Sequence, residues 1–241
     1  MLIVTKKVPH TTQSDLIGVG LYSIPDAARI IKVGEAVLRR WVADYTNTSR
    51  DLDDHHEPVV HRRLNDHGGV LTFLELIELF VVKQFRDAGV SMQVIRKTAQ
   101  VAAQRFDTPY PFATGDFDTD GRSILHAMED SRDGSTSAED LARGQYAFDS
   151  LMHPFFKRLD YRDHAEALRY WPLGRDGRVV LDPQRHFGAP IDARTGVPTR
   201  TLFAAVTAGV GQLLDVVADW FEVPLTAVQA AVDYEALLAT T

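Results

Sequence analysis

Apolar residues recur at helical spacing in two short segments within the first 45 residues of the chain. They are Ile24, Ala27, Ala28 and Ile31 in the first segment and Leu38, Trp41, Val42 and Tyr45 in the second. A spacing of i, i+3, i+4 and i+7 places such residues on one face of a helix. Ser23 and Pro25 are typical of a helix start, and residues 32–34 include the glycine of a tight turn. The pattern predicts two short helices with a common apolar seam, which is a helix-turn-helix.

A β-hairpin is expected after these helices. Residues 46–58 are polar and acidic, so we expect them to form a loop. Residues 59–63 and 70–71 then flank the Gly-containing run 65–69, which is the pattern of two short strands joined by a turn. This hairpin would be the wing of a winged helix-turn-helix.

Two longer helices are expected between residues 72 and 106. Thr72 and Glu75 have the spacing of a capping box and open the first helix, which Gly89 ends. Ser91 opens the second helix, in which the apolar residues keep the helical period.

The middle of the chain differs in composition from both sides. Residues 107–140 contain nine Asp and Glu against two Arg and are rich in Gly, Pro, Ser and Thr. We therefore expect a domain boundary there, with a hairpin near residues 118–121. Residues 145–160 are apolar enough for a helix or an extended arm, which Pro154 interrupts.

The last part of the chain predicts a short strand at residues 178–181 and three helical segments, at about 199–208, 212–221 and 225–238. The predicted fold is therefore mainly α with small β elements: a winged helix-turn-helix plus a C-terminal three-helix domain. The expected division is a flexible arm (1–20), a DNA-binding head (21–106), an acidic connecting or interaction region (107–177, the middle region) and a C-terminal helical domain (178–241, the tail).

Composition excludes several classes of protein. Apolar residues make up 45% and charged residues 24% of the chain, which are ordinary globular values. The absence of cysteine excludes disulfides, Cys-ligated zinc, iron–sulfur clusters and thiol catalysis. No secretory signal is evident, and Glu75 and Glu78 interrupt the most apolar stretch. We expect a cytoplasmic protein that does not contact membranes.

Charge is distributed unevenly along the chain. Residues 1–106 carry 14 Lys and Arg against 12 Asp and Glu, whereas residues 107–241 carry 12 against 21. A near-neutral front with local Arg clusters and an acidic back suits a DNA-contacting head joined to a protein-contacting tail. An acidic surface that only aids solubility explains the same numbers.

The head resembles the winged helix-turn-helix of the MerR family. The resemblance is carried by Tyr22–Arg29 and by Val37–Trp41, whose sequence VLRRW is similar to that family's T-L-R-Y-[YW] signature. Val37 stands where the family has a small hydroxyl residue. The chain also lacks the cysteines of many metal-sensing members, and residues 107–140 lack the heptads of their coiled coil. The resemblance implies that the second helix recognises operator DNA.

The tail resembles the C-terminal family found in VapB-type antitoxins. The matching segments are Asp182–Pro183, Phe187–Ile191, Arg194, Val197–Thr199 and Thr226–Tyr234. Residues 195–196 separate Arg194 from Val197, which departs from the family's pattern. The resemblance implies an antitoxin of a type II toxin–antitoxin pair that binds a VapC-type PIN-domain ribonuclease toxin and represses its own operon. A two-fold homodimer would read paired half-sites in that operator.

Five basic residues are candidates for contact with DNA. Arg39 and Arg40 lie off the apolar face of the second helix, so both can point at a groove or at phosphate. Arg62 and Arg63 are candidate wing contacts, although strand alternation turns one of them inward. Lys32 in the turn is a weaker candidate for phosphate. The alternative for the arginine pair is two solvated side chains on a surface helix.

Other chemistry is less well supported by the sequence. Residues 116–121 match the first half of a calcium loop, but Ala127 stands at the position of the bidentate acid, so a polar turn is favoured. His55, His56, His61 and His67 have no defined ligand spacing. We find no phosphate loop, nucleophile elbow or HExxH pair. We therefore expect neither an enzyme nor a cofactor.

Two hypotheses remain open at this point. The first is the antitoxin, which combines DNA binding with neutralisation of a nuclease. The second is a stand-alone MerR-like transcriptional regulator whose middle region binds a small ligand or another protein. Gene context would separate them, since a small adjacent PIN-type gene favours the first and a divergent metabolic operon favours the second.

Overall fold

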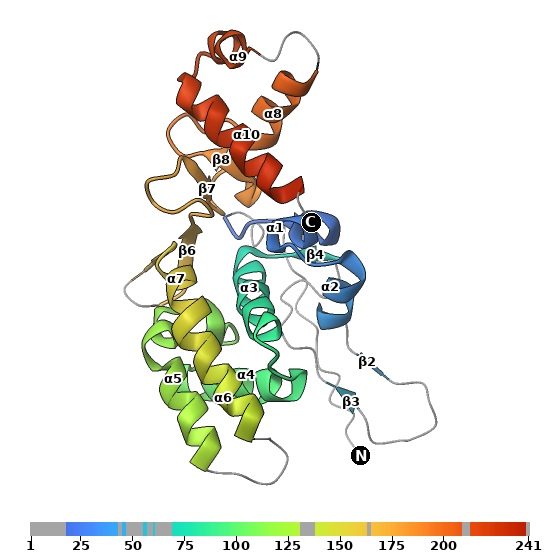
Figure 1. Ribbon diagram of the computed structural model, residues 1–241, viewed down its shortest axis with the longest axis vertical. Helices are drawn as coiled ribbons and strands as arrows, with labels where there is room; N and C mark the ends of the chain where they lie inside the picture. The colour runs from blue at the N-terminus through green and yellow to red at the C-terminus, as the bar shows by residue number, and fades with distance from the viewer. Residues whose placement is uncertain are drawn as a thin grey trace, which may run out of the picture.

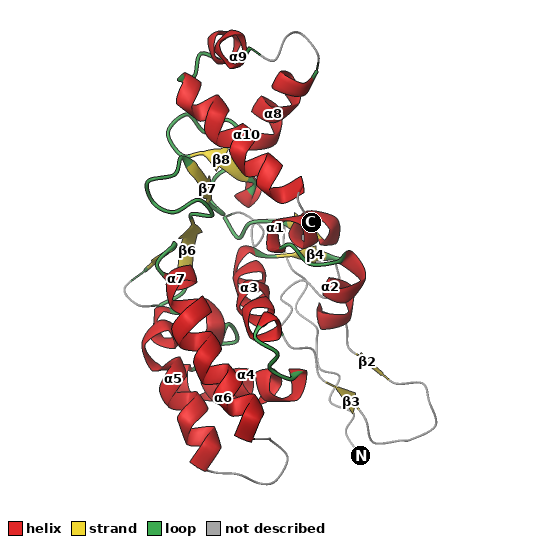
Figure 2. Cartoon of the chain, viewed as in Figure 1, coloured by secondary structure: helices red, strands yellow, loops and turns green. Residues whose placement is uncertain are grey.

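The computed structural model describes residues 18–42, 45–46, 55–56, 60, 69–130, 138–162, 165–208 and 213–239 of the chain. Within these residues the protein is mainly α with small sheets, as the sequence predicts (Figure 2). The molecule is elongated, with the helices of the tail at one end, the first two helices of the head at mid-length, and the two long helices of the middle region at the other end (Figure 1). No helix in the described part of the chain is both long and apolar enough to cross a membrane.

The head contains the predicted helix-turn-helix. Its elements are β1 (Tyr22–Ser23), α1 (Ile24–Ile31), α2 (Glu35–Val42), β4 (Val70–Leu71), α3 (Phe73–Asp87) and α4 (Met92–Phe106). Ser23 begins α1, because its hydroxyl accepts the backbone N–H of Asp26 at 3.2 Å. Lys32 ends α1 in the left-handed conformation. The predicted seam is confirmed for Leu38, Trp41 and Val42, which are buried with the apolar face of α1, whereas the side chain of Tyr45 lies outside the described residues.

Strand pairing in the head departs from the sequence-based expectation. β4 pairs antiparallel with β1, with Tyr22 opposite Leu71, so the chain returns from the wing segment to the start of α1. Residues 46–58 were expected to form a loop, but β2 (Tyr45–Thr46) pairs with β3 (His55–His56). Most of the predicted wing, including residues 61–68, lies outside the described residues.

The middle region contains more helix than its composition predicts. Its elements are η3 (Pro111–Ala113), α5 (Gly115–Asp130), α6 (Ala138–Ala147), the π-helical turn η4 (Phe148–Met152) and α7 (His153–Phe156). The hairpin expected near residues 118–121 is wrong, because this run forms the first half of α5. Thr114 accepts the N–H of Phe117 at 3.2 Å and so begins the helix. Gly121 serves packing, since a Cβ there would lie 2.5 Å from the ring of Phe148.

One apolar core runs through the head and the middle region. It includes the buried faces of α1 to α4 and an aromatic group formed by Phe112, Phe117, Phe148, Phe155 and Phe156. Buried Glu78 on α3 joins the two parts, because it accepts the N–H of Ala113 at 2.7 Å. The change of composition after Phe106 is therefore not a break in the core.

A four-stranded antiparallel sheet leads from the middle region into the tail. Its strands follow chain order: β5 (Leu159–Tyr161), β6 (Ala167–Tyr170), β7 (Val179–Leu181) and β8 (Pro190–Asp192), with η5 (His186–Gly188) between the last two. The tail then contains α8 (Thr199–Thr207), α9 (Leu214–Trp220) and α10 (Leu225–Ala239), close to the three predicted segments. These helices enclose a second, smaller core.

Candidate nucleic-acid interface

Helix α2 buries one face and exposes the other. Its buried residues are Leu38, Trp41 and Val42, which pack against the core of the head. Its exposed residues are Glu35, Ala36, Val37, Arg39 and Arg40. At about 100° per residue these five positions form one continuous surface with Ala36 and Arg40 near its centre. An outer helix of this kind can enter a DNA groove without unfolding the core that supports it.

The two arginines of α2 are placed differently. Arg39 donates from Nε and Nη2 to Oε1 of Glu35, at 3.0 and 2.5 Å, and this pair lies one turn apart on an exposed surface. Surface pairs of this geometry stabilise a helix only weakly, so phosphate can replace Glu35. Arg40 is exposed and has no hydrogen-bond or ion-pair partner among the described residues. Arg40 is therefore the freer of the two cations.

The structure says less about the other three basic residues that the sequence predicts to contact DNA. Lys32 lies half-buried in the turn between α1 and α2, with φ of 60° and a backbone N–H directed at the end of α1. Its place beside the start of α2 suits contact with the DNA backbone. Arg62 and Arg63 lie outside the described residues, so their assignment to the wing stays a prediction.

Two small apolar side chains on the same face were not among the site residues predicted from the sequence. Ala36 and Val37 are exposed on the same face as Arg40, and Val37 is 36% exposed. Small apolar groups let a helix approach base edges closely and can contact a thymine methyl. The missed signal was the exposure of Val37 at a position off the seam, which the helical period already implied.

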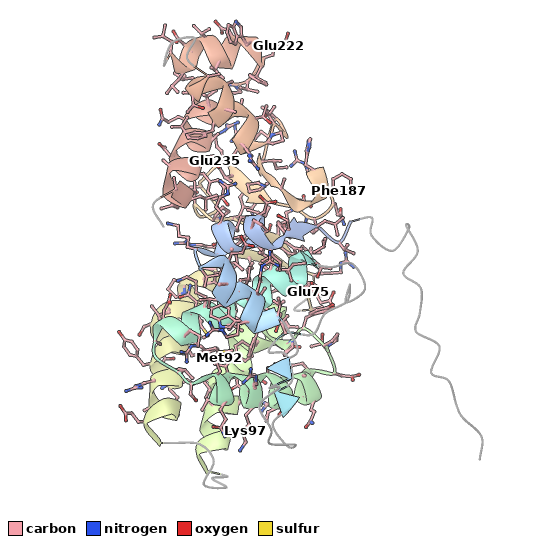
Figure 3. The ribbon with its side chains drawn as sticks, turned by 90° about the vertical axis from the view of Figure 1, so that its right-hand side faces the viewer. Glu75, Met92, Lys97, Phe187, Glu222 and Glu235 are labelled. Carbon is pink, nitrogen blue, oxygen red and sulfur yellow. The ribbon has the colours of Figure 1, made fainter. Side chains whose placement is uncertain are left out.

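The opposite side of the helix-turn-helix is held by the tail. Arg29 of α1 pairs with Glu235 of α10 at 2.6 Å, and Glu235 also accepts the hydroxyl of Thr199 at 2.6 Å. Glu235 is 3% exposed, whereas Arg29 is 36% exposed. Figure 3 shows Glu235 on the tail just beyond the helices of the head. Arg29 therefore has a structural role at the junction with the tail, so we do not count it among the candidate DNA contacts.

A second contact joins β1 to the tail. The Tyr22 hydroxyl donates to the carbonyl of Gly188 at 2.7 Å, and the N–H of Leu21 donates to the carbonyl of Phe187 at 2.8 Å. Burial, with Asp182 nearby, raises the pKa of Tyr22, so its hydroxyl stays protonated and remains a donor. Gly188 has φ of 83° and a Cβ there would lie 2.4 Å from the Tyr22 oxygen, so glycine is required.

A cavity of about 590 Å³ lies where the head, the middle region and the tail meet. Its walls include Val19 and Phe73, the connection from α4 to α5, strand β6, and Asp182 of the tail. Arg169 pairs with Asp182 at 3.0 Å on this wall. The volume is in the range of small-molecule sites.

The structure changes the interpretation of residues 116–121, which match the first half of a calcium-binding loop. Asp116, Asp118 and Asp120 lie on a helix, where Asp120 pairs with Arg105 at 2.9 Å and Asp118 contacts His153 at 3.1 Å. They therefore do not converge on one point. Among the residues that the structure describes, no group of three or more His, Asp or Glu could hold a metal ion. The side chains of the four clustered histidines fall outside those residues.

Comparisons with known proteins agree with this architecture. Residues 20–99 match a family model described as "Putative DNA-binding HTH domain", which covers the head from β1 into α4. The chain is 28% identical over 204 residues to a Mycobacterium tuberculosis protein named "Putative antitoxin VapB45", a match that covers 79% of this chain and 84% of that protein. The X-ray crystal structure of Rv2018 from Mycobacterium tuberculosis aligns with a TM-score of 0.68 and 25% identity, and it covers 90% of this chain and 99% of that one. The head of this chain is a helix-turn-helix domain, within a fold that a solved mycobacterial protein shares along almost its entire length.

Proposed function

We propose that this protein is a DNA-binding antitoxin of a type II toxin–antitoxin pair. The observation that carries the proposal is the combination of two exposed arginines on the outer face of α2 with a likeness, over most of the chain, to a protein named as an antitoxin. In this role the protein is a regulator rather than an enzyme, it acts in the cytoplasm, and it needs no cofactor.

The DNA-binding half of the proposal uses the exposed face of α2. Arg40 reaches base edges or phosphate in the major groove, and Arg39 exchanges Glu35 for phosphate as the helix docks. Lys32 contacts the backbone beside the start of α2. In a MerR-like winged arrangement, Arg62 and Arg63 add backbone contacts from the wing. Two copies of the chain, related by a two-fold axis, read the two half-sites of a palindromic operator.

The toxin-binding half of the proposal concerns a VapC-type nuclease with a PIN domain. Residues 107–241 carry 21 Asp and Glu against 12 Lys and Arg, and this acidic excess would attract a cationic, RNA-binding surface of the nuclease. Binding of the nuclease to this acidic part leaves the cationic face of α2 free for the operator. The protein then represses its own operon and inhibits the nuclease.

A gel-shift assay with the native upstream DNA tests the head. Arg40→Ala should weaken operator binding by about 1–3 kcal/mol if the side chain reads a base. A phosphate contact would instead lower the slope of log K against log salt by about 0.9. Arg122→Ala is the matched control for Arg39→Ala, because each of these arginines pairs with a surface acid. The side chain of Arg122 on α5 is 55% exposed, and that of Arg39 on α2 is 57% exposed. Equal affinities for Arg40→Ala, Arg39→Ala and the control would reject α2 as the recognition helix.

Co-expression with the product of the adjacent gene tests the antitoxin role. A nuclease that co-purifies with this chain, and whose toxicity the chain relieves, is the expected result. An adjacent gene product that neither binds nor is toxic would remove the antitoxin half and leave the DNA-binding half in place.

The cavity between head, middle region and tail favours a second candidate function, a MerR-like regulator controlled by a small ligand. A compound bound there would touch all three parts of the chain, including the start of α3 in the head. Metabolites that raise the thermal midpoint of the purified protein and alter operator affinity would support this candidate over the first.

A further inference from the structure

Helix α9 presents an apolar stripe to solvent. Leu213 is 58% exposed and Trp220 is 61% exposed. Leu213 directly precedes α9, and with the half-buried Val216 and Trp220 it falls at i, i+3 and i+7, which is one side of the helix. The opposite side, with Val217 and Ala218, is buried in the small core of the tail. The residues of the stripe are therefore not needed for the packing of α9 against the tail, because the other side of the helix provides that contact.

Acidic side chains line one side of this stripe and follow its C-terminal end. Asp215 and Asp219 are exposed one turn apart on the adjacent strip of α9, and Glu222 is exposed just beyond the helix. We call these six residues the α9 surface: Leu213, Asp215, Val216, Asp219, Trp220 and Glu222. Arg200, at the start of α8, is the last basic residue of the sequence, so neither α9 nor α10 provides a cation for these carboxylates. An apolar centre with a charged rim is the composition of a protein-binding patch.

The negative charge of the α9 surface indicates which kind of partner can bind there. A second copy of the chain, meeting the same surface across a two-fold axis, would bring three carboxylates from each subunit together without a compensating cation. Nucleic acid is excluded by the same like charge. The complementary partner has an apolar pocket for an indole ring and a rim of Lys and Arg. The surface on which a ribonuclease holds RNA phosphates has such a rim.

We propose that the α9 surface is the docking site for the cationic, RNA-binding face of the partner nuclease. This inference rests on the proposed antitoxin function and adds the place and the chemistry of the contact. Trp220 is the anchor that enters the partner's apolar pocket, and the carboxylates of Asp215, Asp219 and Glu222 take positions that RNA phosphates otherwise occupy. The antitoxin then inhibits the nuclease by competing with its substrate.

The position of α9 permits both activities at once. Figure 1 places α9 at the far end of the tail, with α2 on the head well below it. Figure 3 likewise shows Glu222 at the tip of the tail and Glu235 at its junction with the head. A nuclease on the α9 surface would therefore leave α2 open to the operator.

Affinity measurements with the full chain and the purified nuclease from the adjacent gene test the inference. Trp220→Ala should weaken binding at least about 10-fold, as expected for an exposed aromatic anchor. The triple variant Asp215→Asn/Asp219→Asn/Glu222→Gln should lower the association rate about 10-fold at low salt and flatten its salt dependence. Tyr146→Ala is the control, because Tyr146 is 66% exposed and its helix, α6, lies at the end of the molecule opposite α9 (Figure 1). A short single-stranded RNA should compete with the wild-type chain for the nuclease.

Operator binding by each variant should equal that of the wild type, which shows that the variants are folded. If the wild type binds the nuclease and Trp220→Ala binds within two-fold of it, the inference is wrong and the antitoxin role stands. If the wild type does not bind the nuclease, the antitoxin role and the inference both fail. A Trp220→Ala variant that loses self-association but keeps its nuclease affinity would identify a contact between copies of the chain and overturn the inference.

Discussion

Replacing Glu235 by Gln should loosen the junction between the tail and the helix-turn-helix. The carboxylate is 3% exposed and accepts two hydrogen bonds of 2.6 Å, one from Arg29 and one from Thr199. An amide has the same shape but only one acceptor oxygen, so with that oxygen toward Arg29 its NH₂ group faces Thr199, whose hydroxyl must then accept instead of donate. Loss of the charge assistance costs about 1 kcal/mol, and reorganisation of the Thr199 bond costs up to about 1 kcal/mol more. We expect the free energy of unfolding to fall by about 1–2 kcal/mol.

Replacing Arg29, the partner of Glu235, should destabilise the protein more than replacing Glu235. Arg29→Met leaves the buried carboxylate of Glu235 with only the Thr199 hydroxyl, and an uncompensated buried charge costs about 3–5 kcal/mol. Arg29 is 36% exposed and can be hydrated when its partner is lost, so the two single variants are not equivalent. The double variant Arg29→Met/Glu235→Leu should recover part of the loss, because neither charge remains.

Urea unfolding followed by circular dichroism measures these differences as shifts of the midpoint. Asp233→Asn is the control, since Asp233 is an exposed acid on the same helix, bonded to Gln229. Its change should stay within about 0.5 kcal/mol. Equal, small changes for Glu235→Gln, Arg29→Met and the control would refute the reasoning, because the pair would then contribute nothing to the junction.

Three further predictions concern the core and the sheet. Gly121→Ala should destabilise the protein by about 1–3 kcal/mol despite the better helix propensity of alanine, because the new Cβ would lie 2.5 Å from the ring of Phe148; an unchanged thermal midpoint would contradict this. Burial opposes ionisation of Asp192, but hydrogen bonds from Arg178 and from Thr195 outweigh it and hold the pKa of Asp192 below its ordinary value, so its stabilisation is present above about pH 4 and is lost as the pH falls. Urea midpoints between about pH 5 and pH 2 should therefore fall more steeply for the wild type than for Asp192→Asn. Burial raises the pKa of Glu78 well above its ordinary value, so the stability of Glu78→Gln relative to the wild type should improve as the pH rises from about 4 to 7.

Local signals in the sequence predicted much of the head. Ser23 caps α1, and Thr72 with Glu75 forms the capping box that begins α3. These motifs act within three or four residues, so the order of side chains is enough to identify them. The buried and exposed faces of α2 follow in the same way from the helical period, which is why the exposure of Arg39 and Arg40 could be predicted from the sequence alone.

Helix α5 was missed because its sequence resembles that of a turn. Residues 116–121 alternate Asp with other residues and end in Gly, which favours a turn when only neighbours along the chain are considered. The deciding contact is with Phe148, 27 positions away, which leaves room for no side chain larger than that of Gly121. The charge balance along the chain likewise gave no indication that Glu235 would meet Arg29.

The separation between Arg29 and Glu235 sets an order of events during synthesis. The two residues are 206 positions apart, so a ribosome adding about 5–20 residues per second needs on the order of 10–40 s to deliver the second after the first. The nascent head therefore spends this interval with an unneutralised arginine on α1. Its early folding must depend on the local helix caps and on its own apolar seam, and the arrival of α10 completes a domain that has already collapsed.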